Sequence, residues 1–423
     1  MFTSFSTALS ALDAMSTAID VTGNNLANLN TPGFKDSTTY FRDLVTESLG
    51  AGLGETQVGF GTGTPMTIRQ FTQGAIQSST GILDAAIAGD GFFVVNNSQG
   101  NQLFTRAGSF QVDSSGTLRT NTGEAVQGWT TINPTTGAVD TNAAIANIVV
   151  PVGGVKQPVA TTKMTLSFNL NSAATADSTS DYSETINVYD SLGAAHTLTV
   201  SFQKTGANQW SYATTIPGDD LSGGTAGTPT AISGASGTLT FDANGQLTSP
   251  TNGTPIPIAI TGLADGANDL SMNWNPYTAA GAGTLTQFGQ PSAEEAKSQD
   301  GSAAAQLTKV GLANGGQLLA QYSDGTQLVV GQVAMANIRN PESLIAVGNN
   351  NYQASALTSA PAIGVPDTGG RGDIQGGALE SSTVDIAQEF TNLIVLERGY
   401  QANSRVITTA DELSQETINL IHS

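Results

Sequence analysis

The sequence predicts an α+β fold that is mainly β, with a long α-helix at each end and nested β domains between the helices. Three observations carry this prediction. Apolar residues recur at helical spacing only near the two termini. Alternating apolar residues and Gly-containing turns occupy the region between them. The segment 151–285 is the part richest in Ser, Thr, Gly and Ala, and we interpret it as a β domain inserted into the surrounding β region.

At the N-terminus, the periodicity predicts a helix of about 25 residues with a heptad-like apolar stripe. Ser16 and Gly23 hold two of its seam positions, and Met15 and several alanines widen the stripe. Because the seam mixes small and large residues, we expect a closely packed neighbour. The large apolar residues of the stripe step by three and four, and they are Phe2, Phe5, Leu9, Leu12, Ile19 and Leu26.

Residues 385–421 predict a second and longer helix. Asp385 is placed to cap it, with Gln388 as the capping-box partner. Gly399 interrupts this helix at a cost of about 1 kcal/mol relative to alanine. The apolar residues that we assign to its packing face are Ile386, Phe390, Leu393, Tyr400, Ile407, Leu413 and Leu420.

Two amphipathic helices at opposite ends of one chain can cover their stripes by packing on each other and on other copies of the chain. An ordinary hairpin of two helices within a single chain explains the periodicity equally well.

Between the helices, five segments each predict a strand, a tight turn with Asp, Asn or Ser before Gly, and a second strand. They are 92–106, 110–120, 186–200, 239–249 and 320–330. None has the alternating ligands and terminal Glu of an EF-hand calcium loop, so we interpret all five as plain hairpins.

These patterns divide the chain into four predicted parts. They are the helices at 1–34 plus 384–423, Gly-rich connectors at 35–75 plus 360–383, an inner β domain at 76–150 plus 286–359, and an inserted outer β domain at 151–285.

The residue types exclude several classes of function. The chain has no cysteine, and its two histidines are His196 and His422, so neither a thiolate site nor a histidine-based metal site or triad is predicted. The acidic pairs Asp219/Asp220 and Glu294/Glu295 lack an apolar setting that would raise a pKa. We therefore predict no enzyme activity, no catalytic, cofactor-binding or metal-binding residues, and no cofactor. The tripeptide at 371–373, Arg-Gly-Asp, matches an integrin-binding motif by chance in a Gly-rich loop.

Charge and hydropathy limit the partners and the location. The net charge of -20 predicts repulsion from nucleic acid and from anionic membranes. No run of about 18 apolar residues is present, so membrane insertion is not predicted. Residues 1–34 contain no Lys or Arg, which excludes the basic start of a cleaved secretory signal peptide. We expect a cytoplasmic protein, or one exported by a route that does not read such a signal.

The stretch TGNNLANLNTPGFK, Thr22–Lys35, concentrates asparagine where the first helix is about to end, although asparagine is a mediocre helix former. We interpret its asparagines as residues that fix register against neighbouring chains, as a polar seam residue does in a coiled coil. The Thr-Pro-Gly that follows stops the helix, and simple termination explains this part well. The residues that we assign to this signature are Asn24, Asn25, Asn28, Thr31, Pro32, Gly33 and Phe34.

Residues 24–35, NNLANLNTPGFK, strongly resemble the N-terminal signature of the bacterial flagellar rod and hook proteins. Three further blocks, at 72–95, 331–345 and 376–420, are similar to other shared regions of that family and occur in the same order. The segment 151–285 favours a hook-type member over the shorter rod-type members.

This resemblance implies a structural protein of the bacterial flagellum and its basal body that self-assembles outside the cell into a helical polymer. It implies that the terminal helices pair as a coiled coil and that the polymer is a curved, flexible tube. Such a tube is a universal joint that transmits torque for motility and is crossed by the type III export channel. The implied partners are other copies of the chain, the hook cap, the distal rod protein, the hook–filament junction protein and the export apparatus.

Two alternatives stay open at this point. A distal rod protein of the same family is a rigid drive shaft, and a secreted β-rich adhesin would explain the acidic β composition and the Arg-Gly-Asp tripeptide.

Overall fold

The computed structural model describes residues 2–44, 46–48, 57–133, 136–176 and 182–421. The chain divides into two compact units. The first unit comprises Met1–Val152, Thr308–Gln321 and Gln327–Ser423, and the second comprises Gly153–Leu307 and Tyr322–Thr326. The first unit therefore contains both ends of the chain, and most of the second comes from one continuous segment between them.

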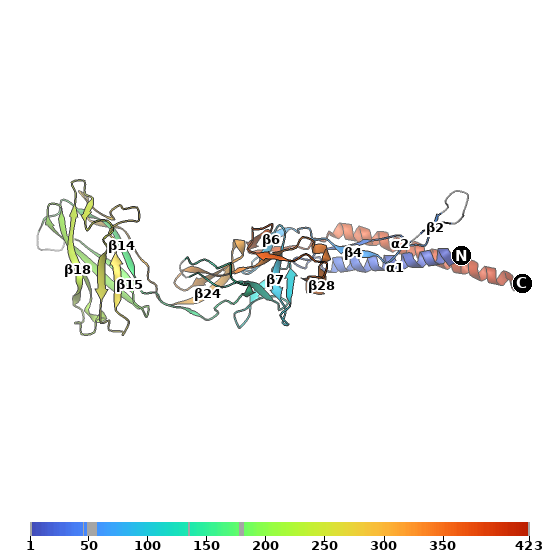
Figure 1. The fold of residues 1–423 in the computed structure, drawn as a ribbon, viewed down its shortest axis with the longest axis horizontal. Coiled ribbons are helices and arrows are strands. Elements are labelled where there is room, and N and C mark those ends of the chain that lie inside the picture. The colour runs from blue at the N-terminus through green and yellow to red at the C-terminus, as the bar shows by residue number, and fades with distance from the viewer. Residues whose placement is uncertain (1, 45, 49–56, 134–135, 177–181, 422–423) are drawn as a thin grey trace. The chain divides into compact units, whose positions relative to one another are not determined.

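The two predicted terminal helices are confirmed as α1 (Phe2–Ala27) and α2 (Ile386–Ile421). They lie side by side and antiparallel, and α2 continues past the start of α1 (Figure 1). Asp385 caps α2 as predicted, because its Oδ1 accepts hydrogen bonds from the backbone N–H groups of Ala387 and Gln388 at 2.8 and 3.1 Å. Neither described helix is long and apolar enough to cross a membrane.

The predicted Gly-rich connectors contain short paired strands. After α1, β1 (Ser37–Tyr40) pairs with β4 (Met66–Arg69), and β2 (Thr46–Ser48) pairs with β3 (Gln57–Gly59). Before α2, β31 (Asp373–Gly376) pairs with β6 (Ala85–Ala88), and β32 (Ala378–Glu380) pairs with β5 (Ile76–Ser78). Strands of three or four residues carry too little periodicity to be recognised in a sequence.

The body of the first unit is a set of short, mostly antiparallel strands. β7 lies near its centre, bonded to β8, β11 and β27. Phe92, Phe104, Trp129 and Tyr352 contribute the large side chains of its core, with the Phe92 and Tyr352 rings edge-to-face at 6.1 Å. The strands and short 3-10 helices (η) of this body are β7 (Phe92–Asn96), β8 (Gln102–Thr105), β9 (Phe110–Val112), β10 (Leu118–Thr120), β11 (Ala125–Trp129), β12 (Ala146–Asn147), β24 (Ala305–Leu312), η2 (Asn314–Gly316), β25 (Gln317–Tyr322), β26 (Gln327–Val333), β27 (Met335–Asn337), η3 (Pro341–Ser343), β28 (Ile345–Gly348), β29 (Asn351–Gln353) and β30 (Ala362–Gly364).

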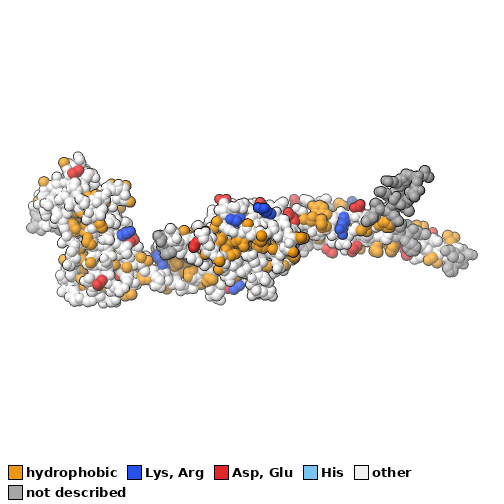
Figure 2. Space-filling view, viewed as in Figure 1, with side chains coloured by type: hydrophobic (Ala, Val, Ile, Leu, Met, Phe, Trp, Pro, Cys, Tyr) orange, Lys and Arg blue, Asp and Glu red, His pale blue; other side chains and the backbone are white. Residues whose placement is uncertain are grey.

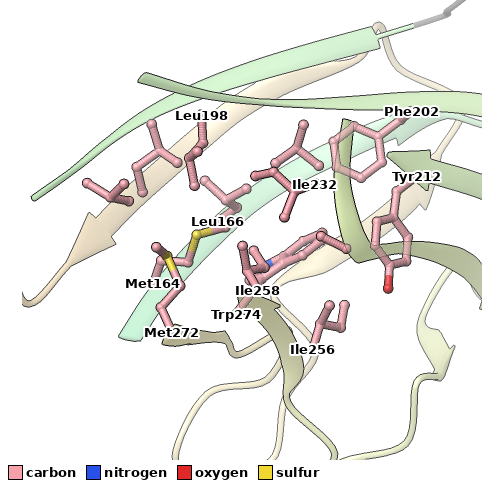
Figure 3. Close-up of a cluster of buried hydrophobic side chains, with 14 of the residues drawn as sticks. Met164, Leu166, Leu198, Phe202, Tyr212, Ile232, Ile256, Ile258, Met272 and Trp274 are labelled. Carbon is pink, nitrogen blue, oxygen red and sulfur yellow. The ribbon is translucent and has the colours of Figure 1, made fainter. Parts of the chain in front are cut away.

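The second unit has two sheets that share one apolar core (Figure 3). One sheet has the order β15-β16-β17-β18-β19, and the other has the order β20-β21-β14-β22 with β23 also paired to β14. Side chains alternate between buried and exposed along β15, β16 and β17, which is the period of a strand with one covered face. The elements are β13 (Val155–Lys156), β14 (Lys163–Asn171), β15 (Tyr182–Tyr189), β16 (Ala195–Gly206), β17 (Gln209–Pro217), η1 (Gly218–Asp220), β18 (Pro229–Phe241), β19 (Leu247–Ser249), β20 (Ile256–Ile260), β21 (Leu270–Trp274), β22 (Leu285–Phe288) and β23 (Ala293–Gln299).

All five predicted hairpins are confirmed as antiparallel strand pairs. Each turn has a glycine with positive φ, for example Gly116 at 85° and Gly245 at 76°. In the turn before Gly245, the Asp242 Oδ1 accepts hydrogen bonds from the backbone N–H groups of Asn244 and Gln246, both at 2.8 Å. The acidic side chain therefore closes its own turn, as expected for a plain hairpin.

The core of the second unit leads to a first prediction. Trp274 is fully buried and its ring meets Tyr212 edge-to-face at 5.4 Å. We expect Trp274→Ala to lower the free energy of unfolding of this unit by about 3–5 kcal/mol, because the truncation leaves a cavity. Guanidinium unfolding followed by circular dichroism measures the loss. Val159→Ala, at a half-exposed position of the same unit, is the control and should change the midpoint little; equal losses in both variants would contradict the prediction.

Candidate assembly interface

The face of α1 that the first unit covers consists of small and polar residues. Its buried members are Ala8, Ala14, Ala18, Thr22 and Asn25. On α2 the corresponding face includes Gly399, where an added Cβ would lie 2.7 Å from Cε of Met15. Any larger residue there would have to displace the end of the Met15 side chain, so Gly399 gives Met15 room against α2. The glycine that appeared to interrupt the helix is thus a packing position.

We call this close contact between α1 and α2 the seam. Most of the large residues predicted for the packing stripes lie outside it. Phe5 and Leu9 are 41% and 53% exposed, and Leu12, Ile19 and Leu26 are partly buried. Phe2 belongs to α1, but its side chain lies outside the described residues. On α2, Leu393 and Ile407 are partly buried. The predicted residues Ile386, Phe390, Tyr400, Leu413 and Leu420 are exposed.

Four further apolar residues of α2 are exposed on this surface, which are Ile394, Val395, Val406 and Ile418. Figure 2 shows apolar side chains at the surface along the helices. We name the exposed apolar residues of α1 and α2 together the outer helix face. Helical periodicity identifies a stripe but does not say which of two adjacent faces turns inward, so the sequence could not separate the outer helix face from the seam.

Asn25 joins three elements within one chain. Its side chain is buried, its Nδ2 donates to the Ser37 backbone O at 2.9 Å and to Glu389 Oε1 at 3.0 Å, and its Oδ1 accepts from the Ser37 N–H at 3.0 Å. Asn25 therefore ties α1 to β1 and to the first turn of α2. A buried amide with all of these partners is costly to replace, since each partner would lose its hydrogen bond.

The other two asparagines of the signature have different surroundings. Asn28 Nδ2 donates to the Asn24 backbone O at 3.0 Å, and Asn28 Oδ1 accepts from Thr31 Oγ1 at 3.1 Å, so Asn28 helps to close the last turn of its own helix. Asn24 is exposed. It lines a groove together with Asn28, Pro32, Arg69 and Tyr352 of the same unit.

Gly33 holds the chain that leaves α1 against the β body. Its φ is 68°, and an added Cβ would lie 2.6 Å from the backbone carbon of Arg106, so no other residue fits. The Gly33 N–H donates to the Glu380 backbone O at 2.7 Å, and Asn350 Nδ2 donates to the Pro32 O at 3.1 Å. Phe34 is buried directly after this turn.

A buried ionic cluster lies next to the turn. Lys35 Nζ is 2.6 Å from Glu380 Oε1, Arg106 Nη1 is 3.3 Å from Glu380 Oε2, and the Lys35 and Glu380 side chains are fully buried. Lys35 also donates to the Thr72 backbone O, and the Gly74 N–H donates to Glu380 Oε1 at 2.7 Å. Burial lowers the pKa of Lys35, and the Glu380 carboxylate opposes that shift. The cluster links the chain after α1 to the chain before α2.

The Arg-Gly-Asp tripeptide is part of a closed loop. The Arg371 guanidinium donates to the backbone O atoms of Val365 and Ala362 at 2.8 and 3.3 Å and to Thr368 Oγ1 at 2.6 Å. The arginine that an integrin would need is thus bonded within the chain, in agreement with the interpretation of a chance match.

Comparison with known proteins gives a consistent result along the whole chain. Four family models match: Flagella basal body rod protein at residues 5–35, Flagellar hook protein FlgE/F/G D1 domain at 86–164, Flagellar basal body protein FlaE D2 domain at 161–302, and Flagellar basal body rod FlgEFG protein C-terminal at 375–420. The chain is similar to the flagellar hook protein of Salmonella typhimurium, with 33% identity over 99% of this chain and 100% of that protein. It is also similar to the flagellar hook protein of Escherichia coli K12, with 31% identity over 98% and 99% of the two chains.

A solved structure agrees on the fold. The crystal structure of Helicobacter pylori flagellar hook protein FlgE2 matches with a TM-score of 0.52 and 16% identity, over 72% of this chain and 100% of that chain.

Removing the central carboxylate of the ionic cluster is the second test. We expect Glu380→Gln to destabilise the first unit by about 3–5 kcal/mol, because Lys35 and Arg106 would remain buried without a counter-charge. Chemical unfolding of the full chain measures the loss. The control Glu294→Gln removes a carboxylate from a surface pair with Lys297, and it should leave stability nearly unchanged. An equally small effect of both substitutions would refute the role of the cluster.

The helix contact should depend on pH through Glu389. Burial raises the pKa of this carboxyl, the hydrogen bond from Asn25 opposes the shift, and the nearby negative charge of Asp36 adds to it. A raised pKa in the folded state means that the folded state binds the proton more tightly. This contribution to stability is therefore complete below pH 4.5 and is lost as the pH rises through the raised pKa.

The measurement is the thermal loss of helical circular dichroism between pH 4 and pH 7.5, compared between the wild-type chain and Glu389→Gln. The difference in midpoint between the two should change in favour of the variant as the pH rises, since the amide keeps its shape and carries no charge. A difference that does not vary with pH would show that Glu389 does not couple the helices to pH.

Proposed function

Because this chain belongs to the flagellar hook protein family and is a structural subunit of the hook, we propose that its copies assemble through α1 and α2 into a curved, flexible tube. This tube is a universal joint that transmits torque between rod and filament and is crossed by the export channel. The observation that carries the proposal is the outer helix face, a set of large apolar side chains that one chain leaves in contact with water.

The side chains of the outer helix face are apolar and exposed, like one half of a core that no second surface covers. Val395 and Leu420 are 63% and 76% exposed, although both lie on a helix that is otherwise packed against α1. Covering such side chains is worth about 25 cal/mol per Å² of apolar area. Many exposed large apolar residues on one pair of helices favour an interaction site, and other copies of the chain present the same surface.

We propose that the helix pair of each copy forms a coiled coil and that the pairs line the inner layer of the tube. The small seam supports the intramolecular part of this packing, and the outer helix face supports packing between copies. α2 continues past the start of α1, and its last turns carry the exposed residues Leu413, Ile418 and Leu420, which would contact a neighbouring pair. Exposed Asn24, in its groove beside Arg69 and Tyr352, is the signature asparagine best placed to fix register against that neighbour.

We also propose the four-part division of the chain, with the connectors at 35–75 and 360–383 between an inner helical layer and an outer β layer. The separate core of the second unit supports an independent outer domain within the predicted 151–285 segment. The paired strands and the Lys35–Glu380 ion pair support connectors that hold firmly where they meet the helices.

The proposed location is the part of the flagellum outside the cell, reached through the flagellar type III export apparatus without a cleaved signal peptide. By family resemblance, further proposed partners are the hook cap, the distal rod protein and the hook–filament junction protein. The relatives named hook protein and the matched D2 domain at 161–302 favour hook over distal rod. The internal bonds of Arg371 argue against the adhesin.

The assembly proposal is tested by placing a charge on the outer helix face. We expect Val395→Asp and Leu413→Asp each to leave the monomer folded, because both positions face water there, and to abolish tube formation by burying an unpaired charge between copies. Electron microscopy and sedimentation of the purified chain read out assembly, and curved tubes of the wild-type chain distinguish a hook from a straight rod. The control is Leu357→Asp, at an 83% exposed position of the β body. Normal tubes from both helix variants would refute the proposal.

A further inference from the structure

Four chemically active side chains meet at one place in the second unit. Asp190 directly follows β15, His196 lies at the start of β16, Asp220 ends η1, and Asp265 lies in the loop between β20 and β21. Three of them belong to the first sheet of the unit and its connections, whereas Asp265 belongs to the second sheet. The cluster therefore lies where the ends of both sheets come together.

The geometry of this cluster is that of a coordination site. His196 Nε2 is 3.1 Å from Asp190 Oδ2 and 3.9 Å from Asp265 Oδ2. Donor atoms of all three residues lie within 4.8 Å of one another. Ligands bound at about 2.0–2.2 Å in a tetrahedral arrangement stand roughly 3.3 Å apart, so one small ion fits among the three. Asp190 and His196 are buried, and Asp265 is partly open to water, which leaves room for a solvent ligand.

The other atoms of the cluster hold these donors in place. Asp190 Oδ1 accepts hydrogen bonds from the backbone N–H groups of Leu192 and Ala194 at 2.8 and 2.9 Å, which leaves Oδ2 directed to the imidazole. His196 Nδ1 is buried and lies 3.1 Å from Asp220 Oδ2, but it makes no hydrogen bond within the described residues, so Asp220 is near enough to support the imidazole without yet holding it. A carboxylate on the far nitrogen of an imidazole is the usual support of a metal-ligating histidine, because it selects the tautomer with Nε2 free to bind.

The negative charge of the cluster also favours binding of a cation. Three carboxylates surround one imidazole, and within the described residues no lysine or arginine forms an ion pair with any of the three. Even a protonated imidazole would leave an excess of two negative charges in a partly buried site. His196 Nε2 is within hydrogen-bond distance of Asp190 Oδ2, and a cation bound among Nε2, Asp190 Oδ2 and Asp265 Oδ2 would offset the excess negative charge more fully than one N–H proton does.

We propose that Asp190, His196 and Asp265 bind one divalent transition-metal ion of the zinc type, with Asp220 as the positioning residue on the far side of the imidazole. The mixture of one nitrogen and two oxygen ligands suits zinc, whereas magnesium and calcium favour oxygen ligands alone. The ion joins the loop around Asp265 to the β15–β16 turn and thus links the two sheets of the second unit. This proposal is independent of the assembly proposal.

The experiment titrates the metal-free full-length chain with Zn²⁺ alone at pH 7.5, by isothermal titration calorimetry and by the shift of the thermal midpoint. We expect one Zn²⁺ per chain and a rise in the midpoint, because the ion binds the folded state alone. Asp265→Asn and His196→Gln should each abolish both signals. Asp220→Asn should weaken binding by about tenfold to a hundredfold, as loss of a supporting carboxylate does. Mg²⁺ at the same concentration should give no midpoint shift.

Two matched controls separate this site from adventitious binding. His422→Gln removes the other histidine of the chain, and Asp219→Asn removes the carboxylate next to Asp220; both variants should bind Zn²⁺ like the wild type. Asp265 is exposed enough for its variant to keep the wild-type fold, which circular dichroism verifies if His196→Gln does not fold. Absence of saturable 1:1 binding, binding that persists in Asp265→Asn, or loss of binding in His422→Gln would each overturn the proposal.

Discussion

The buried contact of Glu380 with Lys35 and Arg106 is the interaction on which the placement of both helices depends. Lys35 lies eight positions after the end of α1 at Ala27, and Glu380 lies six positions before the start of α2 at Ile386. Because both side chains are fully buried, separating them would leave a charge without a partner in an apolar setting, which is far more costly than breaking a surface pair. The end of α1 and the start of α2 are therefore held at one point of the β body, and the helices leave it side by side.

That anchoring decides how the apolar residues are shared between one chain and several. The seam between α1 and α2 is narrow, since Gly399 meets Met15 and the buried positions of α1 are mainly alanine. Phe390 and Leu9 do not enter this narrow seam and remain exposed on the outer helix face. A single chain thus buries the cores of its β units but leaves the outer helix face uncovered. The buried β cores stabilise the monomer, and the exposed apolar residues of the helices favour its assembly with other copies.

The second unit, by contrast, covers its large apolar side chains within itself. Its two sheets enclose a core with fully buried Trp210, Trp274 and Phe202, and it needs no other part of the chain to cover these side chains. The acidic cluster around His196 lies at the ends of the same two sheets, so a bound ion would act on the unit that already has its own core. A domain with its own core can be added to a shorter relative without disturbing the helices, which is consistent with the match of 161–302 to a separate family model.

Much of the fold was predictable because its signals are local. Helix α1, the cap at Asp385 and the five hairpins depend on residues within a few positions of one another, where spacing and turn chemistry are sufficient. The family was also readable from four short blocks. The pairing of β5 with β32 could not be predicted, because each strand has only three residues and the two are far apart in the chain.

The sequence by itself determined that this protein has two amphipathic terminal helices around a β body. Only the tertiary structure decided which face of each helix turns inward, which partners Asn25 binds, and that Asp265 joins Asp190 and His196. The physical reason is that these contacts join residues far apart in the chain, as with Lys35 and Glu380, which are separated by 345 positions. Periodicity shows that a face is apolar, but the packing of distant elements selects the surface that covers it.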